Sequence, residues 1–256
     1  GCIMLTVADV YQYIDSLAPF ETQLDFDNAG LLTGRMTQEV TGIHAALDCT
    51  AGVIQEAEEH GANLIVTHHP LMFHARKRIT EEDEEGQLLC RLIRRKIALI
   101  AAHTNLDQAP GGINDVLADC CGLHHISGEM FLRVGELDAP LTAAELRDQI
   151  AARLHTVVRL MGPENQVIRQ MGVSSGAGGD GWVDAKALGA EAFLSGEIKH
   201  HEALGCVAAG MIALEAGHYA TEAPGIFALA DALQTHLNAV QCNVCVSKSL
   251  IPGYLG

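Results

Sequence analysis

Positive charge is scarce in this chain of 256 residues. It contains 16 lysine and arginine residues against 32 aspartate and glutamate residues, which gives a formal net charge of −16. A field of that sign repels phosphate backbones and anionic membrane surfaces. We therefore expect no nucleic acid and no membrane among the partners of this protein. The same field attracts cations, and an anionic substrate would need local positive charge, most simply from a bound metal.

Long apolar runs are also missing. The chain has no stretch of 18 or more apolar residues, and its first residues contain no basic segment that leads into an apolar one. Hydrophobic residues nevertheless make up 48% of the chain, which is ample for a buried core. Eight cysteines without an export signal are expected to be reduced thiols, so we predict a cytoplasmic protein. The one CxxC motif, at 242–245, is weak evidence for a zinc or redox site.

Strand-like and helix-like patterns alternate along the chain. In the first half, the strands are expected at residues 43–48, 64–67 and 97–102, with helices at 6–17, 50–60, 87–96 and 114–121. In the second half, the strands are expected at 131–136, 157–160, 167–173, 192–195, 211–214 and 240–246, with helices at 142–154, 198–209 and 224–237. We interpret residues 123–129 as a connection, and Pro224 as part of the first turn of the closing helix.

This alternation predicts an α/β protein with mixed or largely parallel sheets flanked by helices. We expect two α/β domains, at residues 1–128 and 129–256, and the C-terminal part is free to pack back on the first domain. The first domain would carry His68, His69, His103 and Asp107. The second would carry His218 and Glu222.

Two adjacent histidines, His68 and His69, follow the predicted strand 64–67. The carboxyl edge of an open α/β sheet is where ligand sites form, and imidazole is the commonest protein ligand for metals such as zinc. Neighbouring side chains on a regular strand point to opposite faces, but Pro70 ends the strand and lets the backbone bend. Both rings can then reach one cavity. The alternative is that one histidine is a hydrogen-bonded core residue and the other is exposed.

Two further strand ends carry residues of the same kind. His103 and Asp107 follow the strand 97–102, and His218 and Glu222 follow the strand 211–214. With the adjacent pair, these residues exceed what one tetrahedral catalytic ion needs, which is three protein ligands and a water. Two divalent ions per chain fit the number better, and Zn, Fe or Mn suits the mixed donors. We expect Glu222 to bridge the two ions.

Several of these residues also have an ordinary structural interpretation. Asp107 precedes a Pro-Gly-Gly segment and can organise a turn, and Glu222 can favour a helix N-terminus. His103 either binds metal directly, or orients Asp107, or serves as a general acid or base. His74 and the pair at residues 200–201 are expected on the surface.

Four segments together resemble the YbgI-like, or Nif-three-like, proteins, which are often named GTP cyclohydrolase I type 2 homologues. The segments are His68-His69-Pro70, His103-Thr104-Asn105-Leu106-Asp107, Ser195-Gly196-Glu197-Ile198-Lys199-His200-His201 and Gly217-His218-Tyr219-Ala220-Thr221-Glu222. The resemblance extends from about Val7 to the C-terminus, with the motifs in family order. It implies two α/β domains around a dinuclear metal centre, often in a ring-shaped homohexamer.

The resemblance also assigns roles to individual residues. It implies that His68, His69, Asp107 and His218 are metal ligands and that Glu222 is the bridging ligand. His103 matches a histidine beside the centre, which we take with Glu222 as a candidate catalytic residue. A further family motif matches residues 25–31, where Phe26 stands in place of the usual tryptophan. The chain is too short for the large central insertion of longer members.

The family name implies a reaction: opening of the imidazole ring of GTP with loss of formate, through attack of a metal-bound hydroxide on C8. We therefore predict a dinuclear metal-dependent hydrolase that acts on a purine nucleotide. One alternative is a metal-binding ring without turnover, acting as a scaffold or regulator. Another is a dinucleotide-binding protein, because Gly176, Gly178 and Gly181 fit GxGxxG between a strand and a helix, and Glu197 follows at the ribose-binding distance. The alternative for that loop is a turn that packs closely on the metal site.

Overall fold

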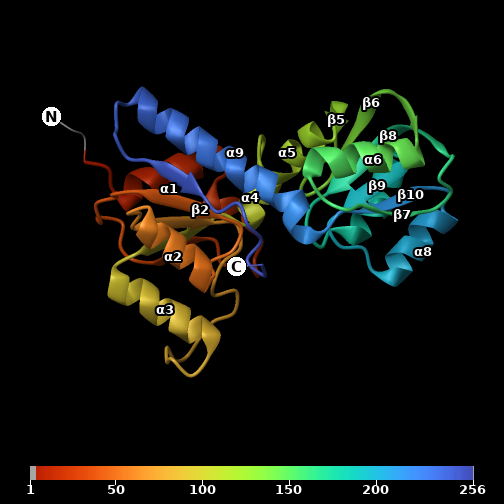
Figure 1. Cartoon of the computed structure of the whole chain (residues 1–256). Coiled ribbons are helices and arrows are strands. Elements are labelled where there is room, and N and C mark those ends of the chain that lie inside the picture. Colours follow the sequence, from red (N-terminus) through yellow and green to blue (C-terminus); the bar gives the residue numbers. More distant parts are fainter. Residues whose placement is uncertain (1–3, 256) are drawn as a thin grey trace. The chain divides into compact units, whose positions relative to one another are not determined.

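The structure is a computed structural model that describes residues 4–255. It divides into two compact units (Figure 1). The first comprises the chain up to Ala109 together with the residues from Ile226 onward, and the second comprises Pro110–Gly225. The boundary that the pattern of elements predicts, at residues 128 and 129, falls inside the second unit.

The first unit is built on a five-stranded sheet with the order β1-β4-β3-β2-β11. Strands β2, β3, β4 and β11 are parallel to one another, and β1 pairs with β4 in the antiparallel sense. The strands are β1 (Gly30–Thr33), β2 (Ile43–Ala46), β3 (Leu64–Thr67), β4 (Ala98–Ala101) and β11 (Val246–Lys248). Every residue of β2, β3 and β4 is buried, as expected for parallel strands that are covered on both faces.

Helices cover both faces of this sheet. They are α1 (Val7–Leu17), α2 (Ala51–Glu59), α3 (Glu84–Arg95) and the later part of α9 (His218–Ala239), with the short α4 (Thr104–Gln108) and the 3₁₀ turn η1 (Phe20–Thr22). Figure 1 shows α2 and α3 on one side of the strands and α1 with α9 on the other. Ile54 of α2 and Leu92 of α3 pack on Ile65 and Leu99 of the sheet. The Tyr13 hydroxyl donates to the Ala232 carbonyl and joins α1 to α9.

The second unit contains a six-stranded mixed sheet with the order β5-β6-β8-β9-β10-β7. Its central strands β8, β9 and β10 are parallel, and the outer pairs are antiparallel. The strands are β5 (His124–Ser127), β6 (Arg133–Thr142), β7 (Arg159–Met161), β8 (Val167–Ser174), β9 (Ala192–Ser195) and β10 (Ile212–Glu215). The helices are α5 (Ile113–Cys120), α6 (Ala143–Leu154), α7 (Trp182–Ala187), α8 (His200–Ala208) and the start of α9, with the 3₁₀ turn η2 (Gly179–Gly181).

Both faces of the second sheet are also covered. Leu117 of α5 and Leu146 of α6 pack on one face, and Ala185 of α7 and Cys206 of α8 pack on the other. Together the two units confirm the predicted α/β class, with mixed sheets flanked by helices.

Three expectations about individual elements were wrong. Residues 123–129 are not a simple connection, because β5 forms the edge of the second sheet beside β6. All four residues of β5 are exposed, so no apolar pattern in the sequence indicates this strand. The closing helix does not begin near Pro224 but at His218, and it contains Pro224 in its interior. The CxxC segment is not a strand, because β11 begins after it, at Val246.

None of the helices within residues 4–255 combines the length and the apolar character that a membrane crossing requires.

A buried histidine outside the predicted sites joins β2 to α2 and to β11. His44 of β2 is fully buried; its Nε2 lies 2.8 Å from Glu56 Oε2 on α2, and its Nδ1 lies 2.7 Å from Ser247 Oγ on β11. Burial lowers the pKa of His44, and the hydrogen bond with Glu56 opposes this effect only in part. The neutral ring is therefore the form that the fold stabilises.

We predict that His44 makes the protein sensitive to acid. The pKa of His44 is lower in the folded chain than in the unfolded one, where it is about 6.5. The unfolded state thus takes up the proton first, and stability present above that pH is lost as pH falls towards the folded value. His44→Gln should be less stable at pH 8, by about 2 kcal/mol, but should lose less stability on acidification to pH 5. Urea unfolding in the presence of a chelator measures both quantities, and equal pH dependence in the two proteins would contradict the prediction.

Candidate metal centre

The carboxyl ends of β3 and β4 bring three histidines of the first unit together. His68 and His69 follow β3 and His103 follows β4, and these strands are adjacent and parallel, with Thr67 opposite Ala101. The Thr67 hydroxyl donates to the His69 carbonyl at 2.8 Å and so stabilises the bend after the strand. The three ring centroids lie 5.0 to 5.5 Å apart. One nitrogen from each ring lies within 4.8 Å of the others, which is an arrangement that can hold a metal ion.

Each of these three rings has its Nδ1 bound to an acceptor that is fixed by the fold. His68 Nδ1 is 2.7 Å from the Ala102 carbonyl oxygen, His69 Nδ1 is 2.7 Å from Asp48 Oδ1, and His103 Nδ1 is 2.7 Å from Asp27 Oδ1. A carbonyl or an ionised carboxylate can only accept, so Nδ1 must carry the proton in each ring. In the neutral ring the lone pair then lies on Nε2. Metal-binding histidines commonly show this arrangement.

Asp27, which accepts the hydrogen bond from His103 Nδ1, is held in its ionised form. Its side chain is fully buried, and burial alone would raise its pKa. Hydrogen bonds from His103 and Thr104 outweigh that effect and hold the pKa of Asp27 well below its usual range. Its Oδ2 also accepts from the Thr104 backbone N–H at 3.0 Å, at the start of α4. Asp27 therefore fixes the His103 ring and the first turn of α4 together.

Asp107 extends the cluster from α4. It is buried, and its Oδ1 lies 3.2 Å from Nε2 of the fully buried His68. Because His68 Nδ1 already donates to a carbonyl, the atoms that face each other here are a carboxylate oxygen and an imidazole lone pair. They repel each other unless a second proton or a cation lies with them. This donor set fits a divalent cation, to which both atoms are suitable ligands.

The second unit contains a smaller group at the start of α9. His218 and Glu222 lie one turn apart on the helix, with His218 Nε2 3.0 Å from Glu222 Oε2. Glu197, just after β9, accepts from His218 Nδ1 at 2.7 Å. The hydrogen bond with Glu222, and to a lesser extent Glu197, raises the pKa of His218 to about 9, against the effect of burial. Two carboxylates around one imidazole make a strongly cation-attracting group.

The glycine-rich loop after β8 packs on this second group. Gly176 has a left-handed backbone with φ 58°. A Cβ at this position would overlap Glu222 Oε1 and lie 3.1 Å from His218 Nε2. The Gly176 N–H donates to the Thr221 hydroxyl at 3.0 Å. The close approach that this glycine permits is thus to a carboxylate, which would repel a pyrophosphate, and the loop fits the alternative of a turn packed on candidate metal ligands.

The structure therefore places the predicted site residues in two groups, each within its own unit. His68, His69, His103 and Asp107 form the first, and His218 and Glu222 form the second. The exposed His74, His200 and His201 belong to neither. Sequence reasoning missed the roles of Asp27, Asp48 and Glu197. A usable signal existed for two of them: Asp48 closely follows β2 and Glu197 closely follows β9, each at the carboxyl edge of the sheet in its own unit.

Comparison with known proteins supports a family assignment. The family model for Duf34/NIF3 (NGG1p interacting factor 3) matches residues 5–251. A protein of Clostridium perfringens named GTP cyclohydrolase 1 type 2 homolog is 34% identical over 241 residues, which cover 90% of this chain and 92% of that protein.

Solved structures agree with this match. A hypothetical protein of Staphylococcus aureus has a TM-score of 0.91 and 30% identity, and the match covers 97% of each chain. The protein ybgI, described as of unknown function, has a TM-score of 0.84 and 26% identity, with 97% of this chain and 99% of that chain covered.

We predict that Asp48 strengthens metal binding by holding the His69 ring. Asp48→Ala should weaken metal affinity about tenfold, because a ring without its Nδ1 partner turns and changes tautomer freely. Asp48→Asn should lose less, since the amide oxygen still accepts from Nδ1. Competition with a chromophoric chelator measures the affinity.

A matched control is Asp25→Ala, which removes an exposed carboxylate of the same unit. If Asp48→Ala and Asp25→Ala bound metal equally well, the positioning role of Asp48 would be excluded.

Proposed function

The chain belongs to the Duf34/NIF3 family, and from that premise we propose that it is a divalent-metal-dependent hydrolase acting on a purine nucleotide. The observation that carries the proposal is the anchored histidine cluster. His68 and His69 have Nδ1 fixed by Ala102 and Asp48, so Nε2 is the nitrogen that can bind a cation, and His103 beside them has Nδ1 fixed by Asp27. Fixed rings lower the cost of ordering the ligands when a metal binds.

The proposal assigns both groups of ligands to one dinuclear centre. A catalytic ion commonly takes three protein ligands, so His218 and Glu222 are too few to hold one alone. His68, His69, Asp107, His218 and Glu222 together provide enough donors for two ions, with Glu222 as the proposed bridge. Imidazole and carboxylate ligands suit Zn, Fe or Mn. When bound, such ions acidify a coordinated water and polarise the substrate.

His103 is proposed as the group that moves a proton. Its side chain is 18% exposed, whereas that of His68 is fully buried, so the His103 ring has access to solvent. Its Nδ1–H is held by ionised Asp27, so Nε2 is the nitrogen that can exchange a proton with the substrate. A histidine fixed in this way can accept a proton at Nε2 and return it to a leaving group.

The choice of substrate follows the name of the relatives. The Clostridium perfringens protein is named GTP cyclohydrolase 1 type 2 homolog, and GTP is therefore the first substrate to test. A ring-shaped homohexamer remains our proposal for the assembly.

We predict about two divalent ions per chain in protein purified under metal-replete conditions, and metal-dependent hydrolysis of GTP or of a related nucleotide. Glu222→Ala should abolish turnover and lower the metal content. Asp231→Ala is the matched control, because it removes a carboxylate that is on the same helix but pairs with Lys248. The assays are elemental analysis and a screen of GTP, other nucleotides and phosphoesters. A metal content near zero would overturn the proposal, and metal without any turnover would favour a scaffold or regulator.

A second prediction separates proton transfer at His103 from metal binding. His103→Asn should keep the metal content of the wild-type protein and lower turnover by about 10²- to 10⁴-fold. If His103→Asn instead lost metal together with activity, His103 would be a ligand and the proton-transfer role would be wrong.

A further inference from the structure

A pocket lies at the edge of the first sheet opposite to the histidine cluster. It has a volume of about 780 Å³ and is lined by residues of the loop 34–41, by Asn63, and by Leu92, Ile93, Lys96 and Ile97. Asn63 immediately precedes β3, and Ile97 immediately precedes β4. The pocket therefore lies at the amino-terminal edge of the same strands whose carboxyl ends carry the histidines. Its volume is within the range of small-molecule sites.

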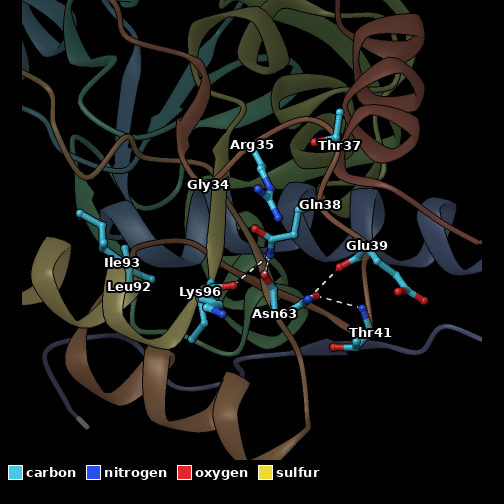
Figure 2. A pocket seen from close by; sticks show the side chains of 11 residues that line it. Gly34, Arg35, Thr37, Gln38, Glu39, Thr41, Asn63, Leu92, Ile93 and Lys96 are labelled. Carbon is cyan, nitrogen blue, oxygen red and sulfur yellow. Dashed lines mark hydrogen bonds between the residues drawn. The ribbon is translucent and has the colours of Figure 1, made fainter.

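Two side-chain amides tie the walls of this pocket together (Figure 2). Gln38 Nε2 donates to the Lys96 carbonyl at 2.9 Å and to the Asn63 carbonyl at 3.2 Å. Asn63 Nδ2 donates to the Glu39 carbonyl at 2.8 Å, and Asn63 Oδ1 accepts from the Thr41 N–H at 2.9 Å. The loop after β1 is thus fixed to the starts of β3 and β4. These hydrogen bonds already hold the pocket walls in place, so the binding of a ligand would not include the cost of ordering them.

The pocket is lined by two cationic side chains, Arg35 and Lys96, and by one carboxylate, Glu39. Arg35 and Lys96 are exposed, and within residues 4–255 neither forms an ion pair with a carboxylate. Their neighbours on α3 differ: Arg94 pairs with Glu81, and Arg95 pairs with Glu58. Lys96 follows the last turn of α3, where a cation is favourable for the helix itself. Arg35 is in a loop, so a helix dipole does not account for a positive charge at this position. In Figure 2 its side chain extends towards Gln38.

The remaining lining has a polar and an apolar part. Thr37 provides a hydroxyl group, whereas the Thr41 hydroxyl already donates to the Gly61 carbonyl at 2.9 Å. Leu92 and Ile93 provide an apolar wall, with Ile93 56% exposed. Glu39 also lines the pocket and can accept from a hydroxyl or amino group of a ligand.

We propose that this pocket binds a small phosphorylated molecule with an apolar portion. A guanidinium binds phosphate oxygens in pairs, and an ammonium adds a point charge. Two cations and the Thr37 hydroxyl match a dianion with three acceptor oxygens better than a carboxylate with two. The apolar portion would lie on Ile93. The site does not depend on the proposed hydrolase function, because it shares no residue with the metal cluster.

The test is calorimetric titration of the whole chain, freed of metal by a chelator, with adenosine monophosphate, adenosine and inorganic phosphate. Adenosine monophosphate should bind at one site per chain, inorganic phosphate more weakly, and adenosine not measurably. Arg35→Gln and Lys96→Gln should each weaken the binding of adenosine monophosphate about tenfold or more, because each removes a charge-assisted hydrogen bond. Raising the salt concentration should weaken it in the same direction.

The matched control is Arg95→Gln, which removes a positive charge one residue from Lys96, at a side chain that does not line the pocket. Its affinity for adenosine monophosphate should stay within twofold of wild type. The proposal would be overturned if none of the phosphorylated probes bound, if Arg95→Gln weakened binding as much as Arg35→Gln, or if binding were lost in His69→Ala but not in Arg35→Gln. Each result is independent of whether the metal-loaded protein turns over GTP.

Discussion

The hydrogen bond at Nδ1 of each histidine is the interaction on which the candidate centre depends. An imidazole has only two ring nitrogens, so fixing one against an acceptor fixes both the direction and the proton state of the other. Here the acceptors belong to the framework: Ala102 is the residue after β4, Asp48 comes shortly after β2, and Asp27 lies in the loop before β1. The parallel sheet thus supplies the histidines and two of their three partners from the same edge. The centre is therefore as rigid as the sheet that carries it.

The electrostatic consequence is a cluster that could hold a cation. Nδ1–H donation leaves lone pairs on Nε2, and Asp107 adds a carboxylate oxygen 3.2 Å from one of them. In the second unit, His218 lies between Glu222 and Glu197, and the hydrogen bond with Glu222 raises its pKa to about 9. A metal ion would replace that proton. These lone pairs and carboxylates lie close together in a chain that already has an excess of negative charge. Their mutual repulsion costs free energy unless a positive charge lies among them.

The sequence predicts the buried strands of this protein better than it predicts the exposed strand β5 or the start of helix α9. The apolar runs of β3 and β9 coincide with the observed strands, because burial on both faces leaves a continuous signal. β5 has no such signal, since its four residues are exposed and its existence depends on pairing with β6. The start of α9 was placed too late because Pro224 resembles a first-turn proline. In the interior of the helix, that proline removes one backbone hydrogen bond and the remaining contacts of the helix tolerate the loss.

A similar division holds for the site. Residue type and position at strand ends identify His68, His69, His103 and Asp107 as candidates, because parallel strands end at a common edge. Their orienting partners depend on which side chains meet in space, and no spacing rule reports that. The glycine-rich loop shows the opposite failure: GxGxxG is satisfied literally, but the space beside Gly176 is filled by Glu222. The motif specifies the backbone conformation that a dinucleotide requires. It does not specify which side chains occupy the space beside that backbone.

The two edges of the first sheet also differ in the charge that they attract. β3 begins after Asn63 and ends before His68, so one strand connects the cationic pocket to the histidine cluster. At about 3.3 Å per residue the two positions are roughly 16 Å apart, which is too far for one small molecule to contact both. The strand between them is fully buried and hydrogen-bonded on both sides, so it holds that separation fixed. Binding at the pocket and at the cluster would therefore be independent, unless a ligand shifted the strand itself.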